Sequence, residues 1–207
     1  MARPKLYNEK ELKALEAHIT NNFGHFEHVL HEVVSPDIHC DVALINPTPE
    51  NDFYTLVTMG MGAHSMNVPK ELRKENLDRA ELMIYLPSNW RFDSEEDQWY
   101  WPVRMLKELA RFPIYANTWL GWGHTTANED WEAYDPTTGF SGVVLLSPQS
   151  PGERVQISKK DFVNFYILIP LHKAEIEFKL QHGIEALMQK FPEDASLIVD
   201  PKRPSTI

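Results

Sequence analysis

The sequence predicts an α+β domain in which helices flank a mixed, largely antiparallel β-sheet. Apolar side chains recur at helical spacing near both ends and near the middle of the chain, and the segments between are short runs rich in β-branched and aromatic residues. With 207 residues the chain is long enough for one large domain. We expect a single domain with a helix over 9–23, a sheet core over about 26–170, a C-terminal helix over 173–191 and a tail over 192–207.

The first helix has a clear signal at its start. Asn8 is followed three residues later by Glu11, which is the pattern of a capping box. An apolar stripe then continues at helical spacing until Gly24, formed by Leu12, Leu15, Ile19 and Phe23. The next run, 25–34, reads as a strand, although a helix remains an alternative because its three histidines stand at positions i, i+3 and i+6.

Three more strands are predicted in the first half of the chain. Residues 38–45 alternate in polarity, which is typical of a half-buried strand. The apolar face of this strand consists of Ile38, Cys40, Val42 and Leu44. The turn-forming loop 46–52 leads to a strand over 53–60, and we expect the two strands to pair antiparallel. A further strand covers 79–87 and stops at Pro87.

A central helix follows these strands. Ser94 with Asp97 three residues on is a variant of the capping box and marks its start. Its inward face is formed by Trp101, Met105, Leu106 and Leu109. We expect this helix to end before Phe112 and Pro113, and to hold Pro102 in its first turn, because a proline deeper inside breaks the hydrogen-bond ladder.

The second half of the chain reads as strands followed by a clear helix. Residues 114–139 are dense in Trp, Gly, Asn and Asp, so we expect loops and strand fragments there. Strands are predicted over 142–148, 154–158 and 162–170, with proline and glycine between them. The C-terminal helix shows one apolar stripe, formed by Ile176, Leu180, Ile184, Leu187 and Phe191.

Composition and charge limit the partners of this protein. Its 20 basic and 30 acidic side chains give a formal charge of −10, which argues against a nucleic-acid backbone and favours a basic partner. No segment reaches the roughly 18 to 20 consecutive apolar residues that span a bilayer, and the N-terminus lacks the apolar stretch of a signal peptide. We therefore expect a cytoplasmic protein without a membrane partner.

The glycine-rich stretch at 60–62 follows a predicted strand, as a dinucleotide-binding turn does. The third glycine of that motif is replaced by Ser65, and Pro69 disfavours the helix that would hold a pyrophosphate. The chain also contains no GK[ST] sequence of a P-loop. We interpret Gly60-Met61-Gly62 as a turn that glycine makes possible.

The sequence offers two weak candidates for a nucleophile. Cys40 stands between His39 and Asp41, but neighbours in a strand face opposite sides, so we expect an inert buried thiol. As the single cysteine it also excludes an internal disulfide and a multi-cysteine zinc site within one chain. The segment 139–142 misses the GxSxG elbow because position 143 is valine.

Histidines provide the remaining routes to catalysis. Four of them, at positions 25, 28, 31 and 39, do not converge in a strand, and in a helix only adjacent pairs would share an ion, so we expect no metal and no cofactor. His124 near Glu129 and Asp130 can act as an acid or a base. A metal-dependent or hydrolytic enzyme built on His124 and these carboxylates is the alternative to a binding protein.

Tryptophans beside carboxylates form the most distinctive pattern. One cluster surrounds the acidic run 93–97 and another surrounds 129–132. Large rings anchor a protein partner, and carboxylates steer a basic one. The alternative is that the tryptophans belong to the core and the acidic residues only favour a helix N-terminus. The candidate partner-binding residues are Trp90, Glu95, Glu96, Trp99, Trp119, Trp122, His124, Asp130 and Trp131.

Several segments stand in an order that is characteristic of a known family. They are HEVVSPDIHCDVALINPTPE (31–50), YTLVTMGMGAHSMNVP (54–69), RAELMIYLPSNW (79–90), GHTT (123–126) and VDPKRPS (199–205). In this order they resemble the suppressor-of-fused domain family in its bacterial, single-domain form, from about Phe23 to Ser205. Where such proteins are expected to have Gly-Met-Ser, this chain has Gly60-Met61-Gly62, so no role of that serine is carried over.

The resemblance implies a mixed α/β domain without known catalysis. Animal members bind and restrain a transcription factor of Hedgehog signalling by gripping an extended peptide through strand addition, and they carry a second, C-terminal domain for which this chain has no room. Bacterial members resemble immunity proteins that neutralise partner toxins in some gene neighbourhoods. We carry no peptide-binding residue across. Our leading hypothesis is a non-enzymatic protein-binding module, an immunity-type inhibitor or regulator that captures a basic or extended polypeptide.

Overall fold

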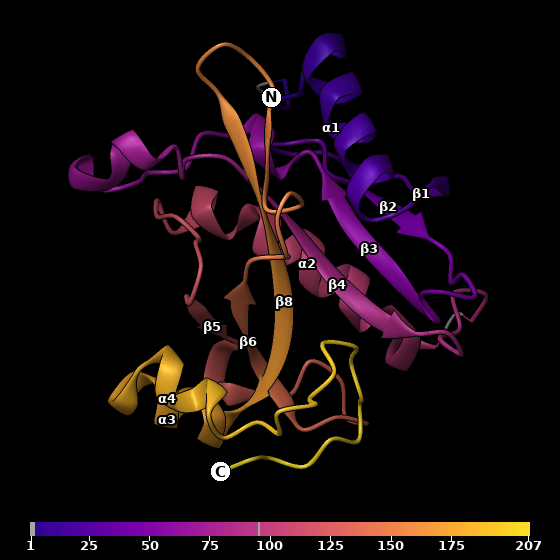
Figure 1. The fold of residues 1–207 in the computed structure, drawn as a ribbon, viewed down its shortest axis with the longest axis vertical. Helices are drawn as coiled ribbons and strands as arrows, with labels where there is room; N and C mark the ends of the chain where they lie inside the picture. The colour runs from indigo at the N-terminus through magenta and orange to yellow at the C-terminus, as the bar shows by residue number, and fades with distance from the viewer. Residues whose placement is uncertain (1–2, 95) are drawn as a thin grey trace.

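The computed structural model describes residues 3–94 and 96–207 (Figure 1). Its strands are β1 (Phe26–Leu30), β2 (Asp41–Ile45), β3 (Phe53–Met59), β4 (Ala80–Pro87), β5 (Thr125–Ala127), β6 (Phe140–Leu146), β7 (Arg154–Gln156) and β8 (Phe162–His172). Its helices are α1 (Glu9–Asn22), α2 (Asp97–Tyr115), α3 (Lys173–His182) and α4 (Ile184–Met188). Short 3-10 turns are η1 (Met61–Ala63), η2 (Lys70–Glu75) and η3 (Glu129–Trp131).

The strands form one eight-stranded sheet in the order β1-β2-β3-β4-β8-β6-β5, and β7 pairs with β8 outside this path. Neighbouring strands are antiparallel except for β4 and β8. The predicted α+β fold with a mixed, largely antiparallel sheet is therefore confirmed. The strands expected over 53–60, 79–87, 142–148, 154–158 and 162–170 are all present within about two residues at each end.

A short parallel seam joins the two antiparallel parts of the sheet. β4 pairs with β8 only over Ala80–Met83 and Asn164–Ile167. Beyond this contact the two strands diverge, and the C-terminal tail lies between their ends (Figure 1). There the N–H of Val199 donates to the carbonyl oxygen of Tyr85 at 2.9 Å.

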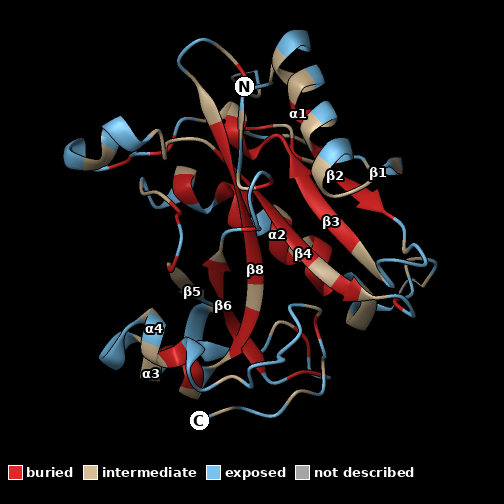
Figure 2. Cartoon of the chain, in the orientation of Figure 1, coloured by how far each residue is buried: buried red, intermediate tan, exposed pale blue. Residues whose placement is uncertain are grey.

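Helices cover both faces of the sheet. Leu15 and Ile19 of α1 pack into one cluster with side chains of β2, β3, β4 and β8. α3 and α4 lie on the same face farther along, because Ile169 of β8 contacts both groups. α2 packs on the opposite face through Trp101 and Leu106. The central strands are consequently buried along most of their length, and the outer sides of the helices are exposed (Figure 2).

The N-terminal elements agree largely with the sequence prediction. In the predicted capping box, Asn8 Oδ1 accepts the N–H of Glu11 at 3.0 Å and Glu11 Oε2 accepts the N–H of Asn8 at 2.9 Å. The run 25–34 is a strand rather than a helix, but only over β1. It ends there because Glu32 turns inward, where its Oε1 lies 2.7 Å from Nη2 of Arg111.

β2 is shorter and more deeply buried than predicted. It begins at Asp41, because Ile38 forms an isolated bridge with Lys5 instead. The predicted apolar face is confirmed, since Ile38, Cys40, Val42 and Leu44 all belong to the cluster under α2. The other face is not solvated, however, because Ala43 and Ile45 pack beneath α1. A sheet covered on both faces makes the expected half-buried strand a fully buried one.

α2 is longer than predicted at its C-terminal end. Its inward side chains are buried as expected, but its start lacks the predicted capping box. Ser94 Oγ accepts the N–H of Glu96, and the side chain of the N-cap residue Glu96 caps no backbone N–H of the first turn. Pro102 is the sixth residue of the helix rather than part of its first turn, and the helix continues through Pro113 to Tyr115. Both prolines are buried, so packing against the sheet outweighs the lost backbone hydrogen bonds.

The predicted C-terminal helix over 173–191 is two helices. Gly183 has φ +87°, a conformation that glycine adopts readily, and it separates α3 from α4. Ile176 and Leu187 are buried as predicted, whereas Leu180 is 66% exposed. The apolar stripe is therefore not continuous, because the break at Gly183 changes the direction of the chain.

A buried carboxylate organises the glycine-rich turn. Glu81 of β4 is 0% exposed and accepts five hydrogen bonds. The donors are Tyr7 Oη at 2.7 Å, Thr58 Oγ1 at 2.5 Å and the backbone N–H groups of Gly60 at 3.0 Å, Met61 at 3.3 Å and Gly62 at 3.1 Å. Burial raises the pKa of Glu81, and these donors oppose that effect.

Both glycines of this turn are required by space. A Cβ atom on Gly60, which has φ +148°, would lie 1.9 Å from the carbonyl oxygen of His39. A Cβ atom on Gly62 would lie 2.1 Å from Tyr7 Oη. The stretch is thus a structural turn, as interpreted from the sequence, and its amides bind a carboxylate of the protein itself.

Removal of the Glu81 carboxylate should strongly destabilise the fold. Glu81→Ala leaves five donors without an acceptor in a dry environment, so we expect the free energy of unfolding to fall by about 3 kcal/mol or more. Urea unfolding followed by circular dichroism measures this change. Glu27→Ala, at an exposed position of β1, is the control; equal stability of the two variants would contradict the assigned role.

The C-terminal tail is fixed to α3 by a second buried carboxylate. Glu175 is 0% exposed and accepts hydrogen bonds from Arg203 at 2.6 and 2.8 Å and from the N–H of Thr206 at 2.9 Å. It also accepts the N–H of His172, which completes a capping box. Burial acts to raise the pKa of Glu175, but Arg203 and these amide donors outweigh that effect and lower it.

The tail contact should make stability depend on pH. Because the pKa of Glu175 is lower in the folded than in the unfolded chain, the ionised group stabilises the fold above its ordinary pKa of about 4.3, and this contribution is lost as the pH falls through the lowered value. Arg203→Gln should weaken the fold and flatten the pH dependence between about pH 5 and about pH 3. Urea unfolding across this range tests the expectation, and parallel curves for both proteins would refute it.

Candidate functional site between α2 and β5

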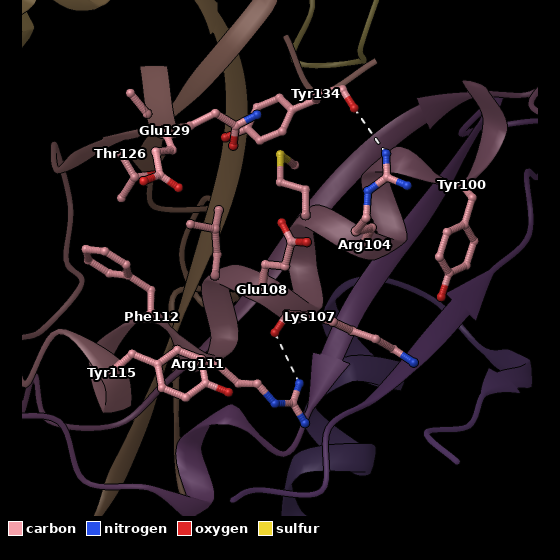
Figure 3. A pocket seen from close by; sticks show the side chains of 14 residues that line it. Tyr100, Arg104, Lys107, Glu108, Arg111, Phe112, Tyr115, Thr126, Glu129 and Tyr134 are labelled. Atoms are coloured by element: carbon pink, nitrogen blue, oxygen red, sulfur yellow. Dashed lines mark hydrogen bonds between the residues drawn. The ribbon is translucent and has the colours of Figure 1, made fainter. Parts of the chain in front are cut away.

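A groove of about 500 Å³ runs between α2 and the segment formed by β5 and η3 (Figure 3). Most of its lining comes from the outward side of α2, and the facing wall comes from residues 126–129 and Tyr134. The lining residues are Tyr100, Arg104, Met105, Lys107, Glu108, Leu109, Arg111, Phe112, Tyr115, Thr126, Ala127, Asn128, Glu129 and Tyr134. The groove thus lies beside an edge of the sheet.

Arg111 holds the α2 wall in place. Its Nη2 lies 2.7 Å from Glu32 Oε1 and its Nε lies 3.1 Å from Asp37 Oδ1, and it also donates to the carbonyl oxygen of Ile38 at 3.1 Å. Burial opposes the charge, but Glu32 and Asp37 raise the pKa of Arg111. This largely desolvated ion pair ties the C-terminal half of α2 to the segment that precedes β2.

The facing wall carries an open strand edge. β5 is the last strand of the sheet, and no other strand within residues 3–94 and 96–207 pairs with its outer side. His124 and Asn128, at either end of β5, hydrogen-bond to the backbone of β6 at 2.9 and 2.7 Å. Because backbone groups alternate in direction along an antiparallel strand, the N–H and C=O groups of Thr125 and Ala127 point away from β6. They are oriented to pair with a further strand.

Aromatic rings give the groove an apolar lining. Tyr100, Phe112 and Tyr115 are all exposed on α2. Tyr134 forms part of the opposite wall, where it stacks on Trp101 with ring centroids 5.8 Å apart. Burial raises the pKa of Tyr134, so its hydroxyl stays protonated. Exposed aromatic rings beside a ring that is packed in place are typical of a surface that binds a protein partner.

The predicted tryptophan and carboxylate cluster at the start of α2 is mostly packed inside. Trp90 is 5% exposed, and its Nε1 donates to the carbonyl oxygen of Trp99 at 2.9 Å. Trp90 therefore belongs to the core, and its assignment to the contact surface is corrected. Trp99 is half-buried against it, and Glu96 is the exposed N-cap residue of α2. Glu95 lies outside the described residues.

The second predicted cluster surrounds β5. Trp119 is half-buried and its ring meets that of His124 edge-on, with centroids 4.3 Å apart. Trp122 is 54% exposed and Trp131 is 36% exposed. Asp130 is exposed beside Trp131, and both have positive φ, at +52° and +62°. Non-glycine residues in this conformation carry strain, which is frequent at functional sites.

Sequence reasoning missed the α2 wall of the groove. Tyr100, Arg104, Glu108 and Phe112 stand four residues apart and form one outward stripe of the helix. The signal that would have identified them is the aromatic residue at each end of this stripe, Tyr100 and Phe112. A helix face that is exposed only to solvent usually carries polar side chains instead.

The catalytic alternative has few of the parts it needs. His124 is half-buried, and burial lowers its pKa. Among the described residues, no group of three or more His, Cys, Asp or Glu side chains is arranged to hold a metal. Burial also raises the pKa of the Cys40 thiol. A nucleophile needs an ionised or activated form, and the structure gives Cys40 neither exposure nor a base.

A hydrogen-bonded chain of serine, histidine and aspartate lies elsewhere, near the start of β2. Ser35 Oγ lies 2.7 Å from His39 Nδ1, and His39 Nε2 lies 3.2 Å from Asp41 Oδ1. Ser35, however, donates its hydroxyl hydrogen to Glu32 at 2.8 Å. A serine nucleophile must donate to its histidine base, so this chain fixes the loop rather than forming a catalytic triad.

Most of the chain matches one protein family. Residues 36–204 match the family described as "Suppressor of fused protein (SUFU)". This chain belongs to the suppressor of fused family. One relative is an uncharacterized protein of Ureaplasma parvum, which is 25% identical over 205 residues, covering 97% of this chain and 98% of that protein. The resemblance found in the sequence is confirmed.

Solved structures of suppressor of fused proteins share this fold. A homolog from Neisseria gonorrhoeae has a TM-score of 0.66 at 18% identity, covering 97% of this chain and 98% of that one. A chain of the Sufu–Fu complex also has a TM-score of 0.66, at 15% identity, covering 99% and 93%. Suppressor of Fused from Drosophila has a TM-score of 0.62 at 15% identity, covering all of this chain and 54% of that one.

Crossing a bilayer would require the helices of this suppressor of fused domain to be long and predominantly apolar. Across residues 3–94 and 96–207, none of them combines the length and the apolar character of a transmembrane segment.

The tryptophans of the two clusters should differ sharply in their effect on stability. Trp90→Ala removes a large buried ring, so we expect the free energy of unfolding to fall by about 3–5 kcal/mol. Trp122→Ala should change it by only about 0.5 kcal/mol, because the ring is exposed. Urea unfolding of both variants, followed by circular dichroism, provides the comparison. A large loss with Trp122→Ala would mean that this indole is part of the core.

Proposed function

We propose that this protein is a non-enzymatic protein-binding module that holds an extended segment of its partner as an added strand on β5. The open backbone edge of Thr125 and Ala127 is the observation that carries the proposal. Main-chain hydrogen bonds along such an edge supply affinity without requiring a particular sequence, and pockets beside it select side chains. The groove between β5 and α2 is such a pocket.

Aromatic side chains support the proposal because they stand where an added strand would project its residues. Tyr100, Phe112 and Tyr115 are exposed on the α2 wall. Rings in fixed positions bury a large area at little entropic cost, which is why they dominate protein-binding sites. Trp122 and Trp131, in the segments that flank β5 in the sequence, are further exposed rings.

The family relationship agrees with a binding role. One related structure is that of the Sufu–Fu complex, in which a suppressor of fused protein is bound to a partner. The formal charge of −10 favours a basic partner, because opposite charges accelerate the encounter. We extend the proposal to an immunity-type inhibitor or regulator that acts in the cytoplasm on a polypeptide encoded near its own gene.

Ala127→Pro should abolish partner binding while preserving the fold. Proline removes the N–H that points away from β6, and a proline is tolerated where that group faces solvent on an edge strand. Co-expression of the tagged protein with the products of neighbouring genes identifies the partner, and calorimetry compares its affinity for the two proteins. Circular dichroism confirms that the variant is folded.

Two further variants make this test decisive. Ala127→Val keeps the N–H and the strand propensity, so it should bind as the original protein does. Phe112→Ala leaves the strand edge intact and should weaken binding about tenfold through the groove. A partner that binds Ala127→Pro and Phe112→Ala with full affinity uses another surface, and the proposal would then be wrong.

A further inference from the structure

The open edge of β5 has two chemically different faces. Thr126 points toward α2, because it lines the groove. Thr125 points to the opposite face, where its Oγ1 lies 3.4 Å from Nζ of Lys179 in α3. Side chains alternate between the two faces of a strand. A strand added to β5 therefore presents its own side chains to α2 and to α3 in turn.

Unpaired carboxylates line the face toward α2. Glu108 of α2 and Glu129 of η3 line the groove from its two walls (Figure 3). Neither takes part in an ion pair with any described residue. Both are exposed, so each is accessible to a partner.

The basic residues that line the groove make no ion pair with these carboxylates. Arg104 donates to the carbonyl oxygen of Tyr134 at 3.1 Å. Arg111 is committed to its carboxylates on the segment before β2. Lys107 extends away from the β5 wall (Figure 3). Glu108 and Glu129 therefore remain free to pair with basic side chains of a partner strand.

Ammonium groups line the face toward α3. Lys179 lies against β5 and makes no ion pair with a described residue. Lys173 places its Nζ 5.2 Å from the ring centroid of Trp131, and its pair with Glu177 at 3.7 Å is exposed to solvent. An exposed pair of this kind contributes little and exchanges partners readily. The ammonium groups of Lys179 and Lys173 are therefore available to acidic side chains of a partner strand.

We propose that the partner strand alternates basic and acidic residues, so that its basic side chains contact Glu108 and Glu129 and its acidic side chains contact Lys179 and Lys173. The inference rests on the proposed function, since it requires a strand on β5. Carboxylates toward α2 and ammonium groups toward α3 match the period of two that a strand imposes. Net charge alone would favour any basic partner. Carboxylates and ammonium groups on opposite faces of the added strand favour a partner whose basic and acidic residues alternate.

Two synthetic peptides of equal composition test the pattern. One alternates lysine and glutamate over about 12 residues, enough to exceed the length of a typical strand, and the other carries the same residues as one lysine block and one glutamate block. Both have no net charge, so the contribution of net charge to binding the acidic protein is the same for both. We expect the alternating peptide to bind about tenfold more tightly in fluorescence anisotropy, and the preference to shrink at high salt.

Charge variants of the protein assign the preference to the two faces. Glu108→Gln and Lys179→Glu should each weaken binding of the alternating peptide about fivefold or more. Glu27→Gln in β1, at the opposite edge of the sheet, and Lys10→Glu in α1 are matched controls at exposed positions and should leave the affinity for the alternating peptide unchanged. Equal losses with the controls would show that only net charge matters.

The Ala127→Pro variant separates failure of the pattern from failure of strand addition. If both peptides bind equally and both are lost in Ala127→Pro, a strand adds to β5 but its charge pattern is not read, and the inference is wrong. If the peptides bind Ala127→Pro as tightly as the original protein, no strand is added to β5 and the proposed function is wrong. No binding of either peptide at about 1 mM contradicts the inference, whereas the proposed function is tested separately with the natural partner and Ala127→Pro.

Discussion

A carboxylate enclosed by protein must take all its hydrogen bonds from the chain around it, and Glu81 is such a group. Its five donors come from the N-terminal segment, from β3 and from the turn after β3. One side chain of β4 thereby fixes the position of three other segments. The close approach of the turn requires Gly60 and Gly62, so the two glycines and the acid form one structural unit where β3 ends and β4 begins.

Core packing also fixes the position of the candidate site. α2 buries Trp101, Met105 and Leu106 against the sheet, and its outward residues form one wall of the groove. Arg111 stands between the two roles, because it lines the groove and also pairs with Glu32. A wall built on core packing keeps its rings in position before a partner arrives, which lowers the entropic cost of binding.

Local features of the fold could be predicted from the sequence, and long-range ones could not. The Asn8 capping box, the strand alternation around Val42 and the inward face of α2 depend on residues within one or two turns of each other. The contacts of Glu81 with Tyr7 and of Arg111 with Glu32 join residues 74 and 79 positions apart. The groove was missed for the same reason, since its walls come from separate parts of the chain. The break at Gly183 was missed because the spacing of apolar residues gives no information on a change in backbone direction.

The parallel seam has a consequence for how the chain reaches its native state. β1 to β4 pair with sequence neighbours, whereas the seam pairs Ala80 with Asn164, 84 positions farther along the chain. Closing so long a loop costs entropy before any contact repays it. The meander of the first half can therefore order early, and the rate of acquiring the whole sheet is governed by the search that brings β8 alongside β4.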